Sequence, residues 1–378
     1  MLSTSNSEVV KKNKAKVFFP NLNGVRALAA LMVVVSHIEL HKIIFNVRRV
    51  PGLNLSNFGR AGVTIFFSLS GFLITYLLLE EKRNFTAINF KSFYMRRLLR
   101  IWPLYFLVVI VGFSFFGGSL RAFLLSVLFL PNLAFCLQML PAIFDPIWSI
   151  GTEEQFYIFH PHFFRIKKLE HIFYALIAFI IFIWSLQFTI DYLVRQHPMY
   201  QALHQVMYYS RFDNMMIGAV VAVLYFNKKH MEFQFKFQKV FNSLFRKSNQ
   251  FILLFVFLIY LVVYLRYEIH HGDILIALLA SLLIVNLCDE ETAIFSLKHK
   301  YLNYIGQISY GIYLLHKFVL LGVLYLVQRY LIQASLITEN IIIYGATIAG
   351  TITLASASYY GYERPFLTIK KRFQKIAQ

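Results

Sequence analysis

The chain has 378 residues, of which 58% are hydrophobic and only 15% are charged, and its mean hydropathy is +0.60. In soluble domains about a quarter of the residues are charged, so this composition excludes an ordinary water-soluble protein and predicts an integral membrane protein. The formal net charge of +19 does not indicate nucleic-acid binding, because the basic residues have to occupy loops and no soluble basic domain remains between the apolar segments.

Eleven apolar runs follow one another along the chain, with lengths near the roughly 20 residues that a helix needs to cross a bilayer. Lipid offers no hydrogen bonds to the backbone, so each run that spans the membrane is expected to be a helix. The runs begin near Gly24, Ala61, Ile101, Ala122, Ile147, Ile172, Met207, Phe251, Ile274, Ile308 and Ile341. No repeat or linker separates them. We therefore predict an all-α, polytopic membrane helical bundle that forms a single integral-membrane domain over residues 1–378.

Lysine and arginine residues concentrate in six segments, at 11–16, 82–100, 165–168, 228–247, 298–300 and 364–375. The positive-inside rule places these segments in the cytoplasm, so an even number of crossings should separate one from the next. Three apolar runs lie between Arg100 and Arg165, and one of them therefore does not cross. We expect this to be 122–137, because it is short and Pro131 removes a helical hydrogen bond within it.

About ten transmembrane helices remain after this correction. The interrupted segment 122–137 is predicted to re-enter from the periplasmic side or to lie along the membrane interface. Ten crossings leave both termini in the cytoplasm, as a tail at 1–20 and a basic tail at 366–378.

The first apolar run contains two ionisable residues, Arg26 and His37. Eleven residues of helix bring these side chains back to one face and separate them by about 16 Å along the axis. Arg26 then lies near the inner interface, and His37 lies about midway across the bilayer. An ionisable residue at that depth is a functional candidate by default. The alternative is a histidine whose hydrogen bonds are satisfied by a neighbouring helix.

The stretch PNLNGVRALAALMVVVSH at 20–37, with ten residues between its arginine and its histidine, resembles the first helix of the bacterial acyltransferase-3 family. Members of that family are membrane-bound O-acyltransferases that modify sugars of the cell envelope. Six further motifs follow in the family's order: GRAGVTIFFSLSGFLIT at 59–75, FYMRRLLRIWPLY at 93–105, WSIGTEEQFYIFHP at 148–161, RFDNMMIGAVVA at 211–222, ISYGIYLLH at 308–316 and YERPF at 362–366.

The resemblance covers nearly the whole chain and implies a reaction. An acyl group would pass from cytosolic acyl-CoA to a glycan at or beyond the periplasmic face of the bacterial inner membrane. Some members carry an appended esterase-like domain, and we expect none here because the chain is too short to hold one. No serine occurs in a nucleophile-elbow setting, so direct transfer from thioester to hydroxyl is the simpler route.

The resemblance and the chemistry together assign candidate catalytic residues. Transfer to a sugar hydroxyl needs a general base, and histidine has the unperturbed pKa suited to that duty, so His37 is the predicted base. Arg26 matches the family's other marked residue, and it either holds the donor or anchors the helix at the inner face. Glu153 occupies the family's acidic position, where it could orient a protonated histidine or hold an acceptor hydroxyl. Its neighbour Glu154 is expected to face the outer interface.

Arg97 and Arg100 are the predicted donor-binding residues. They are three positions apart, so they project from one helix face, and guanidinium groups match phosphate oxygens in a bidentate manner. The resemblance supports contact with the phosphates of coenzyme A. Control of topology and contact with anionic lipids would equally explain a basic cytoplasmic segment.

Several other polar residues are predicted to have structural roles. His316 matches a family position, and core hydrogen bonding is its favoured role. Arg211 and Asp213 are expected to form a structural ion pair. Cys136 and Cys288 match no metal or redox spacing, so we expect no metal and no disulfide.

The sequence thus predicts an O-acyltransferase, in its simplest form an O-acetyltransferase, that transfers groups other than aminoacyl groups. Its co-substrate would be acyl-CoA, and its acceptor would be an envelope glycan or a lipid-linked sugar. The alternative is a polysaccharide transporter or flippase in which the same charged residues line a path. Transporters often contain inverted repeats and paired broken helices, whereas one broken segment is visible here. The acyl group, the acceptor sugar and the oligomeric state are not predicted.

Overall fold

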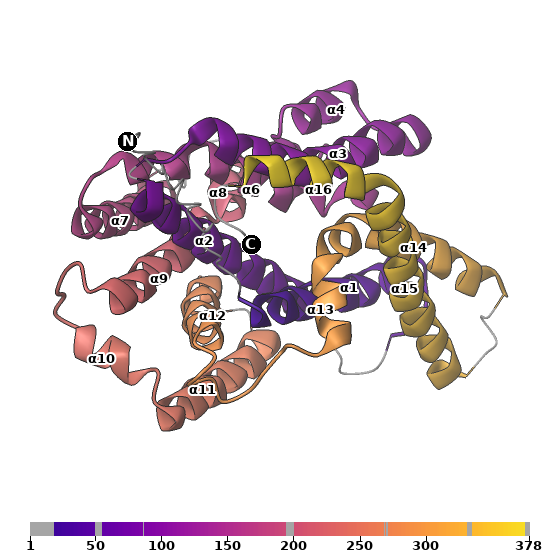
Figure 1. The fold of residues 1–378 in the computed structure, drawn as a ribbon. Helices are drawn as coiled ribbons and strands as arrows, with labels where there is room; N and C mark the ends of the chain where they lie inside the picture. Colours follow the sequence, from indigo (N-terminus) through magenta and orange to yellow (C-terminus); the bar gives the residue numbers. More distant parts are fainter. Residues whose placement is uncertain are drawn as a thin grey trace, which may run out of the picture.

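The structure is a computed structural model, and it describes residues 19–49, 55–85, 87–193, 200–267, 269, 271–330 and 335–374. Throughout these ranges the regular structure is helical, and no strand occurs in them (Figure 1). The predicted all-α polytopic bundle is confirmed. The basic cluster 11–16, most of the predicted tail 1–20 and the last four residues of the tail 366–378 lie outside the described residues.

Seven helices in the described part of the chain are long and apolar enough to cross a membrane. They are α1 (Asn21–Ile44), α2 (Ser56–Phe85), α3 (Phe90–Phe116), α7 (Leu169–Leu193), α11 (Lys247–Arg266), α14 (Ser309–Tyr330) and α15 (Leu336–Ser358), the last of which continues into the C-terminal segment. The three other predicted spans are also helical, but they are shorter or more polar. These are α6 (Ile147–Phe159), α9 (Phe212–His230) and α12 (Gly272–Cys288).

The interruption predicted at 122–137 is present. Two short helices, α4 (Leu120–Val127) and α5 (Pro131–Cys136), replace one long helix. Pro131 stands at the start of α5, where its missing N–H is not needed, and Phe129 just before it has a positive φ of 58°. The chain therefore bends between the two helices. Whether this pair re-enters the bilayer or lies along its interface stays a prediction.

Glycines allow the backbones of the central helices to touch. A Cβ atom added at Gly71 of α2 would lie 1.9 Å from the carbonyl oxygen of Met215 in α9. The same holds for Gly306 of α13 (Lys300–Gln307), where the added atom would lie 1.9 Å from the carbonyl oxygen of Asn23 in α1. Small residues are the usual means of close helix contact in membranes. Gly71 thus lets α2 and α9 approach at backbone distance.

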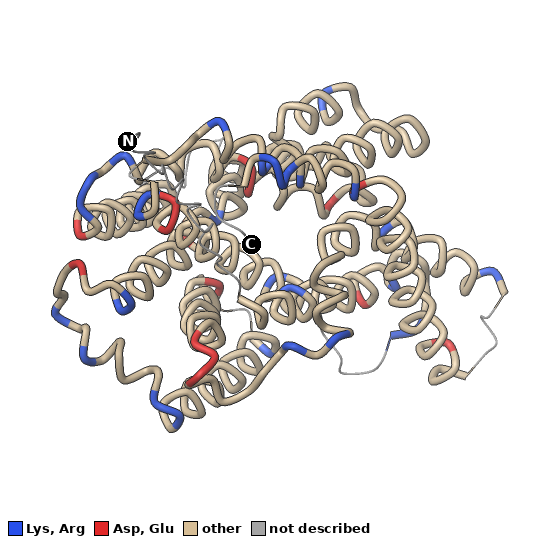
Figure 2. The backbone as a smooth tube through the Cα atoms, viewed as in Figure 1, with Lys and Arg blue, Asp and Glu red and all other residues tan. Residues whose placement is uncertain are grey.

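The C-terminal part of the chain returns to the middle of the bundle. After α15 a π-helical turn (Tyr359–Glu363) leads into α16 (Arg364–Lys370) and a short 3₁₀ turn (Lys371–Phe373). In Figure 1, α16 lies beside α3, with which it is in contact. Figure 2 shows basic residues of these two helices side by side near the middle of the view. Two segments that are far apart in sequence thus bring positive charge to one place.

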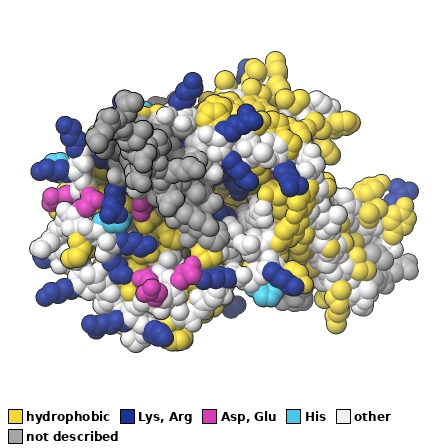
Figure 3. Space-filling model, viewed as in Figure 1, with side chains coloured by type: hydrophobic (Ala, Val, Ile, Leu, Met, Phe, Trp, Pro, Cys, Tyr) yellow, Lys and Arg dark blue, Asp and Glu magenta, His cyan; other side chains and the backbone are white. Residues whose placement is uncertain are grey.

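The outer faces of the bundle carry the apolar side chains expected toward lipid. On the face drawn in Figure 3, hydrophobic side chains cover the region of α4 and the edge formed by α15. On α11 the large exposed residues are Phe251, Ile252, Phe255, Val256, Leu258, Ile259, Val262 and Val263. The remaining helices are α8 (Tyr200–Ser210) and α10 (Gln238–Ser243), with 3₁₀ segments at Ala142–Phe144 and His160–Arg165.

Candidate active site

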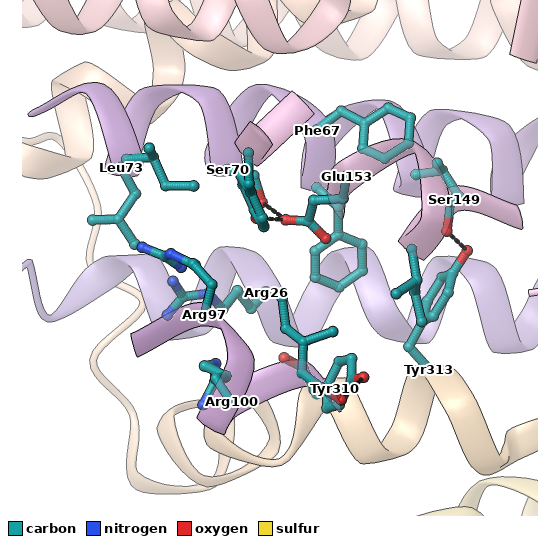
Figure 4. A pocket seen from close by; sticks show the side chains of 17 residues that line it. Arg26, Phe67, Ser70, Leu73, Arg97, Arg100, Ser149, Glu153, Tyr310 and Tyr313 are labelled. Carbon is teal, nitrogen blue, oxygen red and sulfur yellow. Dashed lines mark hydrogen bonds between the residues drawn. The ribbon is translucent and has the colours of Figure 1, made fainter. Parts of the chain in front are cut away.

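A cavity of about 110 Å³ lies between α1, α2, α3, α6 and α14. Three arginines, Arg26, Arg97 and Arg100, gather at one end of it (Figure 4). Glu153 lies in its middle, and a hydrogen-bonded pair, Ser149 and Tyr313, lies at the other end. The remaining lining residues are Val63, Phe66, Phe67, Ser70, Leu73, Ile74, Ile101, Ile150, Tyr157, Ser309 and Tyr310. One end of the cavity is therefore cationic, and the other offers hydroxyl groups.

A second cavity, of about 220 Å³, shares the three arginines and Leu73 with the first. Its other described lining residues include Phe19, Asn23 and Gln307, and also Lys370 from α16. The two cavities adjoin at these arginines, and together they are called the cationic path below. The second cavity lies toward the start of α1, which is the end that the positive-inside rule assigns to the cytoplasm.

Two arginines of this path, Arg26 and Arg97, are held by neutral groups. Arg26 donates a hydrogen bond to the side-chain oxygen of Asn23 over 3.0 Å. The guanidinium of Arg97 stacks on the rings of Phe93 and Tyr157, at 5.7 and 5.3 Å from their centroids, and its Nε has no hydrogen-bond partner although it is buried. Aromatic faces orient a guanidinium without using its N–H donors. Those donors are therefore available to a ligand.

In the described part of the chain, the basic residues of the path form no ion pair, and Glu153 is the one carboxylate that lines the same cavities. None of Arg26, Arg97, Arg100 and Lys370 has a described carboxylate oxygen within 4.0 Å. The neighbouring Arg96 differs, since it bonds Glu81 over 3.0 Å and the carbonyl oxygen of Phe373 over 2.9 Å. Four unpaired cations that line one path favour an anionic ligand.

Lys370 was missed in the sequence analysis. It belongs to the basic cluster 364–375, which the positive-inside rule explained without a binding role. Its place in the path depends on the π-helical turn that folds α16 back toward α3. A turn of this kind leaves no periodic signal in the sequence. The basic cluster itself was the one available hint.

Glu153 lies inside the cavity, as a residue that handles substrate would. Its Oε1 accepts hydrogen bonds from the hydroxyl groups of Ser70 and Tyr157 (Figure 4). It makes no described contact with His37, so the first of its two predicted roles, orienting that histidine, has no geometric support. Glu154 does not face the outer interface as expected. It is 8% exposed and accepts a hydrogen bond from Nε1 of Trp102 over 2.9 Å.

His37 forms a pair with His316. The Nδ1 of His37 lies 2.6 Å from the Nε2 of His316. The side chain of His316 is completely buried, and that of His37 is partly exposed. His37 is not among the residues that line the cationic path. Tyr313 lies between the cavity and the histidine pair, because it lines the cavity and its ring centroid lies 6.2 Å from that of His316. Tyr313 thus lies next to His316, and His316 contacts His37.

An ion pair lies directly beside the histidines. Lys317, which is completely buried, donates hydrogen bonds to the carbonyl oxygen of Ala142 and to Oδ2 of Asp145, the latter over 2.6 Å. Burial raises the pKa of the Asp145 carboxyl, and the Lys317 ammonium opposes that shift. This ion pair joins α14 to the segment before α6.

The expected ion pair between Arg211 and Asp213 is wrong. Arg211 pairs with Asp273 of α12 over 2.8 Å, and Asp213 accepts a hydrogen bond from Nε1 of Trp184 over 3.1 Å. Proximity in sequence suggested the first pairing. The packing of α9 against α12 instead brings Arg211 to Asp273.

These features define a polytopic helical membrane protein with an internal cationic path that reaches Tyr313, next to a pair of histidines of which His316 is buried. The chain belongs to the acyltransferase family, since the family model described as an acyltransferase domain matches residues 19–360. The family resemblance of the motifs is thereby confirmed.

Over the aligned regions, curated relatives are identical to this chain at about a quarter of the positions. YrhL of Bacillus subtilis (strain 168), whose name provisionally describes a peptidoglycan O-acetyltransferase, is 27% identical over 79% of this chain and 48% of its own length. The peptidoglycan O-acetyltransferase OatA of Listeria monocytogenes (strain EGD-e) is 26% identical over 80% of this chain and 49% of its own length. A Staphylococcus aureus (strain COL) protein, named provisionally as an O-acetyltransferase, is 27% identical over 94% of this chain and 58% of its own length. The chain thus spans about half the length of these relatives. No solved structure matches it significantly.

Proposed function

We propose that this protein transfers an acyl group, in the simplest case acetyl, from cytosolic acyl-CoA to a hydroxyl group of an envelope glycan or a lipid-linked sugar. The observation that carries the proposal is the path lined by Arg26, Arg97, Arg100 and Lys370. The path ends at Tyr313, whose ring lies next to that of His316 in the histidine pair. Membership of the acyltransferase family and the names of the relatives support it. A glycan is proposed as the acceptor because the names of these relatives describe O-acetyltransferases of peptidoglycan.

The cationic path suits the donor because coenzyme A carries several phosphate groups. Guanidinium groups bind phosphate oxygens with two parallel hydrogen bonds, and the unpaired donors of Arg97 face no competing carboxylate. In this arrangement the phosphates rest among the cations, and the pantetheine arm extends past Glu153. The thioester then lies at the end that holds Ser149 and Tyr313.

In the proposed reaction one proton is transferred, and the thioester bond is replaced by an ester bond. The acceptor oxygen attacks the thioester carbonyl carbon, while His37 takes the hydroxyl proton. The carbon–sulfur bond then breaks, and the proton passes from the imidazolium to the leaving thiolate. The products are the ester and free coenzyme A. Glu153 has room to hold an acceptor hydroxyl, which is the second of its predicted roles.

A transfer assay in membrane vesicles tests the proposal. Inverted inner-membrane vesicles from expressing cells expose the cytoplasmic face and contain the native acceptors, so acetyl-CoA labelled in its acetyl group can be added directly. We expect label to enter a membrane-bound glycan fraction with the wild type and not with His37→Gln. We expect an Arg97→Ala, Arg100→Ala double variant to raise the KM for acetyl-CoA by about a hundredfold or more, since two lost charge-assisted bonds, each worth about 1.5–3 kcal/mol, together come to about 3 kcal/mol at least.

Two results would reject the proposal. If wild-type vesicles incorporate no more label than vesicles from cells without the protein, the protein does not transfer acetyl groups from acetyl-CoA. If incorporation is absent while export of glycan depends on the protein, the transporter alternative is favoured. The Arg96→Ala variant serves as the control for the arginine pair, because Arg96 already bonds Glu81 and lies outside the path.

A further inference from the structure

The contact between His37 and His316 has the geometry of a hydrogen bond in the plane of both rings. The two rings are nearly coplanar, with an angle of 6° between them, and their centroids are 4.9 Å apart. That separation equals roughly the distance between the nitrogens plus the radius of each ring, so the rings meet edge to edge. Rings stacked face to face could not place two nitrogens 2.6 Å apart at this centroid separation. The N–H and the lone pair of an imidazole both lie in its plane, which is where this contact is.

The other nitrogen of His316 fixes which ring donates. Its Nδ1 lies 2.8 Å from the carbonyl oxygen of Tyr313 and 3.2 Å from that of Ile312. A carbonyl oxygen only accepts hydrogen bonds, so this Nδ1 carries a hydrogen. A neutral His316 then has a bare Nε2, which must accept. A His316 protonated on both nitrogens would bury a second cation beside the Lys317 ammonium, which costs far more than the neutral form.

We infer that His316 is a positioning residue that sets the tautomer of His37. Because Nε2 of His316 accepts, Nδ1 of His37 has to donate, and the hydrogen of the neutral His37 ring therefore lies on Nδ1. The Nε2 of His37 is left with a free lone pair, which is the atom that takes the hydroxyl proton. The same acceptor stabilises the ring after it becomes an imidazolium. This inference rests on the function proposed above.

Helix α14 is held so that His316 keeps this orientation. The next residue, Lys317, ties α14 to the segment Ala142–Asp145 through two hydrogen bonds. The two carbonyl contacts of His316 come from its own helix, one turn earlier. The ring of His316 is therefore constrained by the helix backbone, and α14 is constrained by the ion pair. Rings fixed in this way act as outer partners that orient a reactive ring.

Substitutions of His316 test the inference in the vesicle assay. His316→Leu removes the acceptor, and we expect the maximal rate to fall about 100-fold while the KM for acetyl-CoA stays within twofold, since general base catalysis contributes at least that factor. His316→Gln offers an amide oxygen in a similar place, and it should recover part of the rate. Leu320→Ala, one turn further along α14 and equally buried, is the control for lost packing. It should reduce thermal stability without a comparable loss of rate.

A second measurement does not depend on activity. Solid-state NMR of protein labelled with ¹⁵N-histidine in lipid bilayers distinguishes the two tautomers of a neutral ring, and spectra of His37→Asn and His316→Leu assign the signals. We expect wild-type His37 to be protonated on Nδ1 and bare on Nε2, with a mixture of tautomers in His316→Leu. A wild-type His37 protonated on Nε2 overturns the inference.

The two tests separate failure of the inference from failure of the proposed function. Suppose that the wild type transfers acetyl groups, that His37→Gln does not, and that His316→Leu keeps at least a third of the wild-type maximal rate. His37 is then still supported as the general base, and the positioning role of His316 is wrong. If the wild type transfers nothing, the proposed function fails, and the NMR measurement still decides the tautomer.

Discussion

At the scale of single residues, the structure separates groups that handle charge from groups that handle a proton. The cations of the path and the histidine pair lie at opposite ends of one arrangement, with Glu153 and Tyr313 between them. The spacing of Arg26 and His37 in α1 sets this distance, since eleven residues of helix extend about 16 Å. A long, flexible donor with phosphates at one end and a thioester at the other fits such a separation.

The ion pair beside the histidines provides a prediction at this scale. Asp145→Asn leaves the buried Lys317 ammonium without a charged partner, because only neutral oxygens remain to accept its hydrogen bonds. We expect it to destabilise the protein by about 3 kcal/mol, the low end of the range for breaking a buried pair, because the Asp145 side chain is 28% exposed. Thermal unfolding in detergent, followed by intrinsic fluorescence, measures the loss.

The matched control removes both charges. The double variant Lys317→Met, Asp145→Leu should regain most of the stability that Asp145→Asn loses, because no unpaired charge remains buried. If the double variant is no more stable than Asp145→Asn, the loss arises from packing and not from the ammonium.

At the scale of helices, close contact between backbones determines where the polar side chains lie. Gly71 places α2 against α9, and Gly306 places α13 against the start of α1. Because α13 leads directly into α14, the second contact also sets the position at which His316 meets His37. Polar residues near the middle of a bundle depend on such contacts, since a shift of one helix by a single ångström would separate nitrogens that are 2.6 Å apart.

Gly71→Ala tests the backbone contact. The new methyl group would lie 1.9 Å from a carbonyl oxygen of α9, so the two helices have to separate. We expect a loss of about 3 kcal/mol or more, at the upper end of overpacking costs. Gly322→Ala in α14 is the matched control, because nothing lies within 4 Å of its added atom. It should be neutral or stabilising by up to about 1 kcal/mol. Equal losses in the two variants would show that the contact does not matter.

Helix α16 provides a second prediction at this scale. Lys370 lines the cationic path, whereas the adjacent Lys371 is exposed. Lys370→Ala should raise the KM for acetyl-CoA by about tenfold, since a charge-assisted hydrogen bond to phosphate is worth about 1.5–3 kcal/mol, and the maximal rate should change little. Lys371→Ala should leave both parameters near the wild type. A KM unchanged in Lys370→Ala means that α16 takes no part in donor binding.

The sequence predicted the helices better than it predicted their partners. Apolar length located ten helical segments, and Pro131 marked the break between α4 and α5. The Arg26 and His37 spacing identified a candidate site on one helix. Contacts between distant segments were not predictable in this way, because hydrophobic periodicity shows which residues face inward and not what they meet. The bond from His316 to His37 and the pairing of Arg211 with Asp273 are of this kind.

At the scale of the whole molecule, the account depends on the orientation of the bundle in the membrane. The cationic path has to open toward the cytoplasm, where acyl-CoA is found. The basic segments between helices favour this orientation under the positive-inside rule. The basic loop at 228–247 and the loop after α11 lie on opposite sides of one predicted crossing.

Cysteine labelling in intact cells tests the orientation. Both native cysteines, Cys136 and Cys288, are buried and can be replaced by alanine. In that background, Tyr267→Cys, at an exposed position after α11, should react with a membrane-impermeant maleimide in cells whose cytoplasmic membrane is intact. Lys239→Cys, exposed on the short helix α10 before α11, should react only after the membrane is permeabilised. The reverse pattern would place the cationic path on the outer side.

The most direct test of the central claim is mass spectrometry of envelope glycans from cells that express the wild type or His37→Ala at matched membrane levels. The host should lack its own glycan O-acylation, so that every acyl increment depends on this protein. The account predicts an acyl increment on the glycan with the wild type and its loss with His37→Ala. An undiminished increment in the His37→Ala cells would contradict the account, because the reaction would then proceed without its proposed proton acceptor.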